Sequence, residues 1–209
     1  MKFLQGDTFL TRALNRLIEC VLLSALWLVT SLPVVTIGAA TTARYDVVFH
    51  LIKDDDKGIL SAYFSSFKNN FKRSTLAFII MLALGAFLAV DLWSAAQWKT
   101  GYQFLFVVVI LGVGYFYLMM LSHIFAGIAF FDGSVTAVLK KVFSLAIRNG
   151  IYTVFVMVMF MLPFAMFFKT ISTNMFGGFV MVYLLFGNSA IVYLNSLHLE
   201  KLFSSYDKG

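Results

Sequence analysis

Five long runs of apolar residues constrain this chain more strongly than any other feature of its sequence. The runs cover about residues 17–32, 74–90, 102–131, 151–168 and 175–197, and Glu19 is the only Asp, Glu, Lys or Arg within them. A helix needs roughly 20 apolar residues to cross the hydrocarbon core of a bilayer, which is about 30 Å thick. The runs approach or exceed that length, so they predict an all-α polytopic membrane protein.

The composition agrees with this prediction. Of 209 residues, 61% are hydrophobic and only 12% are charged, whereas a typical soluble domain has about 25% charged residues. So few polar side chains cannot coat a globule, and lipid must cover part of the surface. The net charge of +6 then indicates the cytoplasmic excess of Lys and Arg that membrane proteins show, and not a nucleic-acid partner. We expect a single membrane domain over residues 1–209.

Three segments that precede apolar runs combine apolar and basic residues at helical spacing. They cover residues 3–16, 59–73 and 135–149, and this pattern predicts amphipathic helices at the membrane interface. A secretory signal also begins with basic residues, but here the basic region is long and carries apolar residues of its own, so we expect no cleavage. The predicted layout is three hairpin-like units, over residues 1–58, 59–133 and 134–209.

The stretch from Trp27 to Lys53 decides the topology. The first apolar run stops at Pro33, and a helix restarts at Gly38 that spans only about 23 Å over some 15 residues. If this segment lies outside lipid, there are five spans and Lys and Arg divide 5 to 11 between the two sides. If it returns through the membrane with Arg44 embedded, 13 lie inside and 2 outside. The stronger asymmetry predicts six membrane-embedded helices, the second short and polar, with both termini cytoplasmic.

Ionisable residues in or beside the membrane mark candidate functional positions, because burying a charge in lipid is costly. The candidates for a substrate site or polar network are Glu19, Arg44, Asp46 and His50. They line a polar cavity or ion path, or they form a hydrogen-bond network that supports a broken helix. The pattern favours the hydrogen-bond network that supports the broken helix. The polar cavity or ion path stays as the alternative interpretation.

If the first two helices form an antiparallel hairpin that turns near Val35, Glu19 lies level with His50 and Leu51, Ser24 with Asp46, and Leu26 with Arg44. Leu26 cannot satisfy a guanidinium, so we expect Arg44 to find a carboxylate or carbonyl groups elsewhere. Asp46 and His50 are four residues apart and can pair on one helix face.

The second amphipathic segment has the most distinctive surface pattern of the chain. Its candidate partner or lipid interface consists of Phe64, Phe67, Lys68, Phe71, Lys72 and Arg73. Aromatic residues in the acyl boundary and cations on anionic headgroups would anchor such a helix to lipid. The same surface can dock on a partner protein. The pattern favours lipid anchoring, because interfacial helices commonly share it.

No constellation in the sequence indicates catalysis, a metal or a cofactor. His50, His123 and His198 are far apart, Cys20 has no partner for a disulfide, and no HExxH, GxxxxGK[ST], GxSxG or GxGxxG motif occurs. Asn188 and Asn195 lie seven residues apart in the last run, which indicates contacts between helices. We therefore expect a protein that is not an enzyme.

Two motifs carry a resemblance to a known family. They are Trp27-Leu28 with the stretch SLPVVTIGA at residues 31–39, and Phe64 with the stretch SFKNNFK at residues 66–72. In these motifs the chain resembles the YesL family, small bacterial integral membrane proteins with a domain of unknown function.

The resemblance implies a location in the bacterial cytoplasmic membrane. Members of the family are often encoded beside carbohydrate importers of the ATP-binding-cassette type, so it also implies an accessory or partner subunit that contacts the permease subunits of such an importer. The alternative is a small transporter or channel that uses the broken hairpin around Arg44 and Asp46.

Overall fold

The computed structural model describes residues 9–53, 55, 58–97, 102–156, 158 and 183–207, and all regular structure within them is helical. The predicted all-α class is confirmed. Residues 150–156 are also helical. The other helices are α1 (Phe9–Thr30), the short 3-10 helix η1 (Val34–Thr36), α2 (Ile37–Ile52), α3 (Ile59–Gln97), α4 (Gln103–Phe130), α5 (Val135–Arg148), the π-helical turn η2 (Tyr183–Gly187) and α8 (Asn188–Asp207).

The first two helices form the predicted hairpin. α1 ends at Thr30, just before Pro33, whose ring removes a backbone donor and disfavours a helical conformation in the residue before it. The Thr36 hydroxyl then donates to the carbonyl oxygens of Thr30 and Pro33, which closes the turn. α1 is continuous from Phe9, so from that residue onward the predicted interfacial helix and the first apolar run are one helix.

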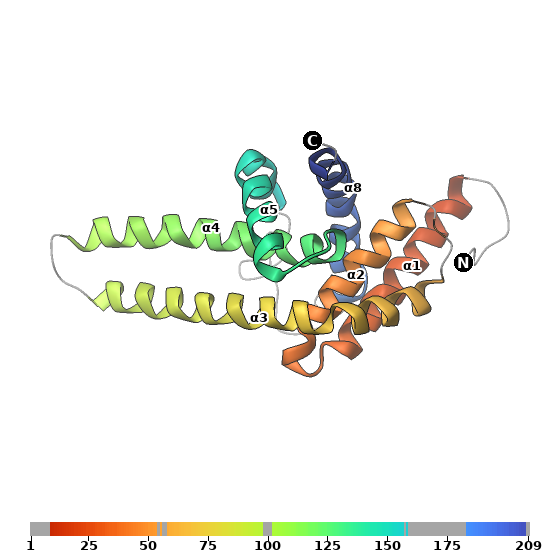
Figure 1. Cartoon of the computed structure of the whole chain (residues 1–209), viewed down its shortest axis with the longest axis horizontal. Coiled ribbons are helices and arrows are strands. Elements are labelled where there is room, and N and C mark those ends of the chain that lie inside the picture. Colours follow the sequence, from red (N-terminus) through yellow and green to blue (C-terminus); the bar gives the residue numbers. More distant parts are fainter. Residues whose placement is uncertain are drawn as a thin grey trace, which may run out of the picture.

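The core of the molecule is built around α2. This helix packs against α1, α3, α4 and α8 (Figure 1), and its small and branched side chains are fully buried, among them Ala39, Ala40, Ala43, Val47 and Val48. This segment is too short and too polar to be assigned as a membrane span from hydropathy alone, yet the structure buries it in the core. Its small residues allow neighbouring helices to approach closely.

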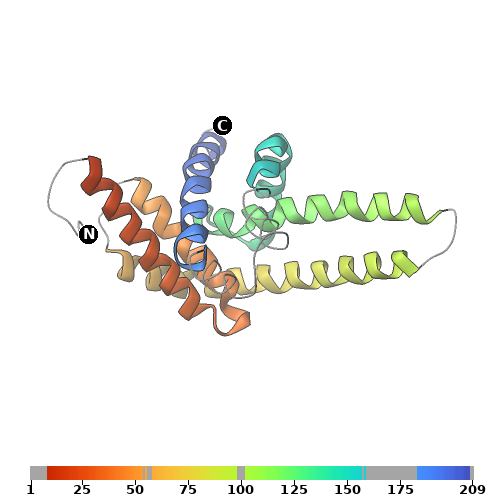
Figure 2. The ribbon, with the colours of Figure 1, turned by 180° about the vertical axis from the view of Figure 1, so that it is seen from behind.

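α3 and α4 form a second, much longer hairpin (Figures 1 and 2). α3 contains 39 residues and is therefore about 58 Å long. The predicted boundary between an interfacial helix and a membrane helix near Arg73 is wrong, because α3 passes through it without a break. Apart from Phe71, residues 68–74 are polar, and they include neither Gly nor Pro. The change in polarity at this point therefore does not interrupt the helical backbone.

The outer half of this hairpin exposes apolar side chains all round. Trp93 is 68% exposed and Phe104 is 78% exposed. Among the described helices, α3 and α4 are long and apolar enough to cross a membrane, and their described residues from Ser74 to Phe130 include no Lys or Arg. These findings support membrane association.

α5 and α8 lie across the α3–α4 pair (Figures 1 and 2). α8 continues to Asp207, so the predicted polar tail from Glu200 is in fact the end of a helix. The reason is its own apolar stripe: Leu199 and Phe203 are fully buried, and the Phe203 ring contacts those of Phe49, Phe130 and Phe131. Most of the predicted span at residues 151–168, with Pro163, and the loop with Lys169 lie outside the described residues, as do Lys2 and Lys99.

Candidate functional site: the polar residues of the first hairpin

Glu19 lies on α1 near the end of α2. It accepts a hydrogen bond from Arg16 at 3.0 Å, and the same guanidinium donates to the carbonyl oxygen of Leu51 at 3.1 Å. The register of the predicted hairpin is therefore close to the observed one, since the turn of α1 that carries Glu19 is level with the end of α2. The partner of Glu19 is Arg16, however, and not His50.

Asp46 and His50 pair as predicted, but loosely. The His50 Nε2 atom lies 3.9 Å from Asp46 Oδ1, whereas His50 Nδ1 lies 3.1 Å from Asp55 Oδ2. These side chains are partly exposed at the end of α2. They form a small cluster of Asp and His side chains near the C-terminal end of α2.

Arg44 lies apart from that cluster. It is two residues from Asp46 on α2, so the two side chains leave the helix on roughly opposite sides. Arg44 is only 3% exposed, and its guanidinium carbon lies 4.8 Å from the centre of the Trp27 ring. The Trp27 indole donates to the Thr41 hydroxyl at 3.0 Å, which holds the ring in place. The structure thus does not bring Arg44 together with Asp46 and His50 into one path.

Hydroxyl groups join the first hairpin to its neighbours. The Tyr63 hydroxyl lies 2.7 Å from the Thr30 hydroxyl, and it donates weakly to the Ala40 carbonyl at 3.4 Å. On the same side of α3, Ser74 donates to the Thr42 hydroxyl at 2.8 Å. These bonds tie α1, α2 and α3 together.

The last helix joins this network through residues far apart in the sequence. Ser24 donates to the Ser189 hydroxyl at 2.6 Å, and so it pairs with α8 and not with Asp46. Asn195 donates to the Tyr45 hydroxyl at 3.1 Å and accepts from Tyr152 at 3.2 Å. The contact between helices predicted for Asn195 is confirmed. Tyr45 and Tyr152 were missed, because no local pattern marks partners 150 and 43 residues away.

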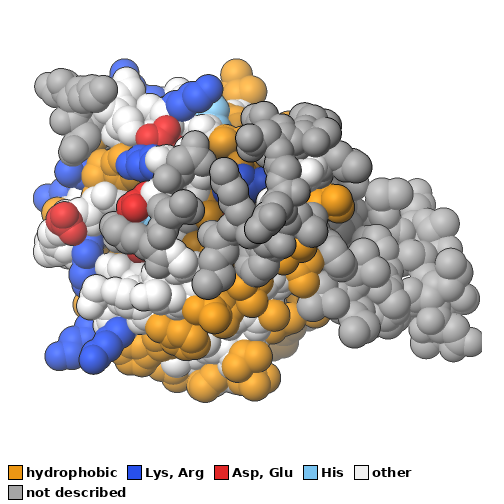
Figure 3. Space-filling view, turned by 90° about the vertical axis from the view of Figure 1, so that its right-hand side faces the viewer, with side chains coloured by type: hydrophobic (Ala, Val, Ile, Leu, Met, Phe, Trp, Pro, Cys, Tyr) orange, Lys and Arg blue, Asp and Glu red, His pale blue; other side chains and the backbone are white. Residues whose placement is uncertain are grey.

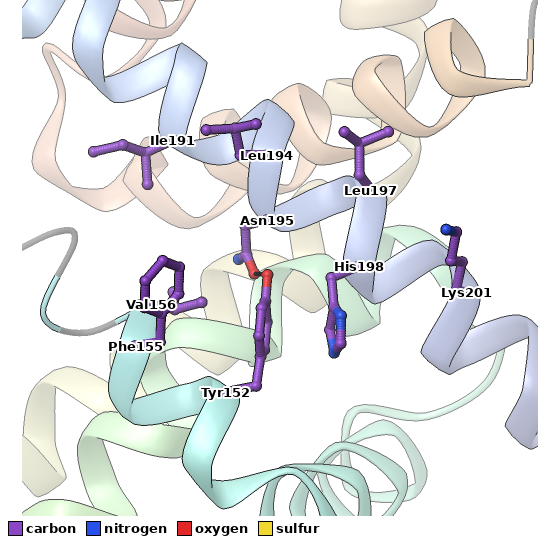
Figure 4. Close-up of a pocket in the computed structure, with 9 residues that line it drawn as sticks. All are labelled: Tyr152, Phe155, Val156, Ile191, Leu194, Asn195, Leu197, His198 and Lys201. Atoms are coloured by element: carbon purple, nitrogen blue, oxygen red, sulfur yellow. Dashed lines mark hydrogen bonds between the residues drawn. The ribbon is translucent and has the colours of Figure 1, made fainter.

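A pocket of about 460 Å³ lies between residues 152–156 and α8 (Figure 4). Its wall is mostly apolar, and Asn195 points towards Tyr152 within it. The His198 ring stacks on Tyr152 with 3.6 Å between the ring centres. His198 therefore belongs to an aromatic contact, and among the described residues no group of three or more His, Cys, Asp or Glu side chains could hold a metal ion.

The structure divides the predicted aromatic and basic surface in two. Phe64 is 52% exposed, and Lys68 and Lys72 are exposed on the same side of α3; we call these three residues the α3 stripe. Phe67 and Phe71 are half-buried, in ring contact with each other. Arg73 is also half-buried, and it donates to the Phe131 carbonyl at 2.8 Å.

The end of the molecule opposite the tip of the long hairpin carries most of the charge seen in Figure 3. In that view basic and acidic side chains gather in the upper and left parts, and hydrophobic side chains gather below, where the turn of the first hairpin lies. Leu32, Val34 and Val35 of that turn are exposed. The turn of the first hairpin is thus apolar, and the charge seen in this view lies away from it.

Comparisons with known proteins bear on this region. Residues 20–92 match the family model described as "Protein of unknown function, DUF624". The match covers the second half of α1, all of α2 and most of α3, and so it includes the buried Arg44 and the α3 stripe. It supports a domain family of unknown function, and it is consistent with the resemblance to YesL proteins. No curated protein and no solved structure matches the chain.

Proposed function

We propose that this chain is a non-enzymatic partner subunit of a larger membrane assembly, and that the α3 stripe is its docking surface. The observation that carries the proposal is the continuity of α3. One helix runs from the stripe into the apolar hairpin without a break. The opposite side of its first half, with Ile59, Tyr63 and Ser66, is buried in this chain, while the stripe is uncovered.

Continuity favours a protein partner over lipid anchoring. An interfacial helix lies in the plane of the membrane with its apolar side in the acyl boundary. A helix that is collinear with a span instead leaves the membrane, and the 15 residues from Ile59 to Arg73 would extend about 22 Å beyond it. An exposed phenylalanine with two lysines further along the same helix face fits a protein surface with an apolar pocket and acidic neighbours.

The nature of the partner follows from the resemblance described above. It implies the permease subunits of a carbohydrate importer of the ATP-binding-cassette type, in a bacterial cytoplasmic membrane. We further propose six membrane-embedded helices with cytoplasmic termini. The absence of Lys and Arg from the described residues between Ser74 and Phe130, and the basic residues on both sides of that stretch, support this orientation.

Affinity purification from native membranes tests the proposal. We expect the wild-type chain to recover permease subunits in a mild detergent. The double variant Lys68→Glu/Lys72→Glu should lower their yield about tenfold or more, which corresponds to about 1.4 kcal/mol of binding free energy. The matched control is Lys140→Glu/Arg148→Glu on α5, where the same charge change is made at two exposed positions.

The control variant should recover the permease as well as the wild type does. Recovery of this chain alone from native membranes would contradict the proposal. Equal losses with both double variants would also contradict it, since binding would then depend on net charge and not on the α3 stripe.

A further inference from the structure

The most unusual side chain in the described part of the molecule is Arg44. It is 3% exposed, and its Nε and Nη1 atoms have no hydrogen-bond partner. A guanidinium remains charged at physiological pH, and a buried charge without a partner is strongly destabilising. Contact with the Trp27 ring offsets part of this cost, but a ring face cannot accept hydrogen bonds from the edge of the guanidinium.

The chain offers Arg44 no carboxylate in the described region. Glu19 pairs with Arg16, Asp55 with His50, and Glu200 lies 4.0 Å from Lys53. Asp46 leaves α2 on the other side, and no salt bridge joins Arg44 to any described acidic residue. The sequence from residue 133 to residue 199 contains neither Asp nor Glu. The counter-charge must therefore come from outside this set of residues.

Residues of three helices lie near Arg44. Trp27 and Thr30 come from α1, Ala40 and Arg44 from α2, and Tyr63 from α3, and the Tyr63 hydroxyl contacts both Thr30 and Ala40. The phenols of Tyr45, Tyr63 and Tyr183 lie within electrostatic reach of the guanidinium. Tyr183 begins the π-helical turn η2, and π-helical turns are frequent at functional sites.

We propose that Arg44 is the anchor of an occluded oxyanion site, which takes one carboxylate or phosphate group. The planar guanidinium presents its N–H groups as a fork that matches two oxygens of such a group. The Trp27 ring closes one side. The proposal concerns binding only, and it depends neither on the α3 stripe nor on any partner.

Thermal unfolding in detergent tests the site. Sodium acetate or sodium phosphate, compared with sodium chloride at equal ionic strength, should raise the Tm of the wild type by about 3 °C. Arg44→Met should remove this response, and so should Arg44→Lys in large part, because lysine lacks the fork. The matched control is Arg148→Met, which removes an exposed arginine from α5 and should respond as the wild type does.

The bound group can belong to a free anion or to a lipid headgroup, and a second arm separates these sources. If the source is a lipid, exhaustive exchange into detergent lowers the wild-type Tm, and phosphatidylglycerol restores it where acetate and phosphate do not. Fluorescence gives a readout that does not require Arg44→Met to fold. With Trp93 and Trp98 replaced by Phe, the signal of Trp27 should change saturably on addition of the same anion or lipid.

Two results would overturn the proposal. One is a wild-type protein whose Tm and Trp27 fluorescence respond to none of acetate, phosphate and phosphatidylglycerol. The other is a response of equal size in the wild type and in Arg44→Met, which would place the anion elsewhere on this basic protein.

Discussion

Single residues set how closely the helices of this protein approach. A Cβ atom at Gly38 would lie 2.5 Å from the carbonyl oxygen of Ser74 and 2.8 Å from the Cβ of Phe78. The first of these atoms belongs to the backbone of α3 and cannot turn away. The contact between α2 and α3, which carries much of the core, therefore depends on the absence of a side chain at this position.

We predict that Gly38→Ala destabilises the protein by about 1–3 kcal/mol, because the two helices must separate to admit the methyl group. Unfolding by heat or by denaturing detergent measures the change. The control is Gly112→Ala on α4, where an added Cβ meets nothing within 4 Å. That variant should be neutral or slightly more stable, since alanine favours a helix over glycine; equal losses in both variants would refute the argument.

Asn195 is a single polar residue that joins separate segments of the chain. Its amide is bonded to Tyr45 and to Tyr152, which lie on different segments. We predict that Asn195→Leu costs about 1–3 kcal/mol of stability, because it leaves a phenol without its buried partner. Ser204→Ala, which removes a bond within α8 to Glu200, should cost much less in the same unfolding assay. A loss no larger than that of the control would show that the bridge is dispensable.

At the scale of elements, the long hairpin leads to a prediction about membrane topology. α3 and α4 present apolar side chains outward over their outer halves, so their tip and the α3 stripe should lie on opposite sides of the membrane. With the native thiol removed by Cys20→Ser, we predict that Tyr102→Cys is labelled by an impermeant maleimide from outside intact cells. Ser65→Cys, beside the stripe, should be labelled only after the membrane is opened.

Both positions are exposed, so a failure to react would reflect sidedness and not burial. Labelling of both cysteines from the same side would contradict a membrane-spanning hairpin. The result would then favour an α3–α4 pair that lies on the membrane surface, where lipid anchoring again becomes the better interpretation of the aromatic and basic residues.

At the scale of the whole molecule, the proposed six-helix topology places both termini in the cytoplasm. We predict that a fluorescent reporter that folds only in the cytoplasm is active when fused after Gly209, and that a reporter active only outside gives no signal there. Truncation after Tyr102 should give the reverse pattern. An external C-terminus would contradict the six-helix topology. The five-span alternative, with its larger share of Lys and Arg inside, also places the C-terminus in the cytoplasm, and it differs in an external N-terminus.

The residues also show how far sequence reasoning reached. It predicted the helical class, the hairpin near Pro33, the Asp46–His50 pair and the role of Asn195, because each depends on hydrophobic period or on spacing along one helix. It missed the continuity of α3 and the burial of Leu199 and Phe203. A polar segment in the sequence can mark either the end of a helix or the point where a continuous helix passes from lipid to water. Only contacts with the neighbouring helices distinguish these two cases.

The sequence by itself determined that this protein is helical and indicated association with a membrane, because composition and apolar runs decide which solvent each segment prefers. The tertiary structure decided which polar groups meet. It separated Arg44 from the acidic residues nearest to it along the chain, and it set Trp27 against its guanidinium. The physical reason is that burial and pairing depend on contacts between α1, α2 and α3. The spacing of residues within a single helix carries no information about those contacts.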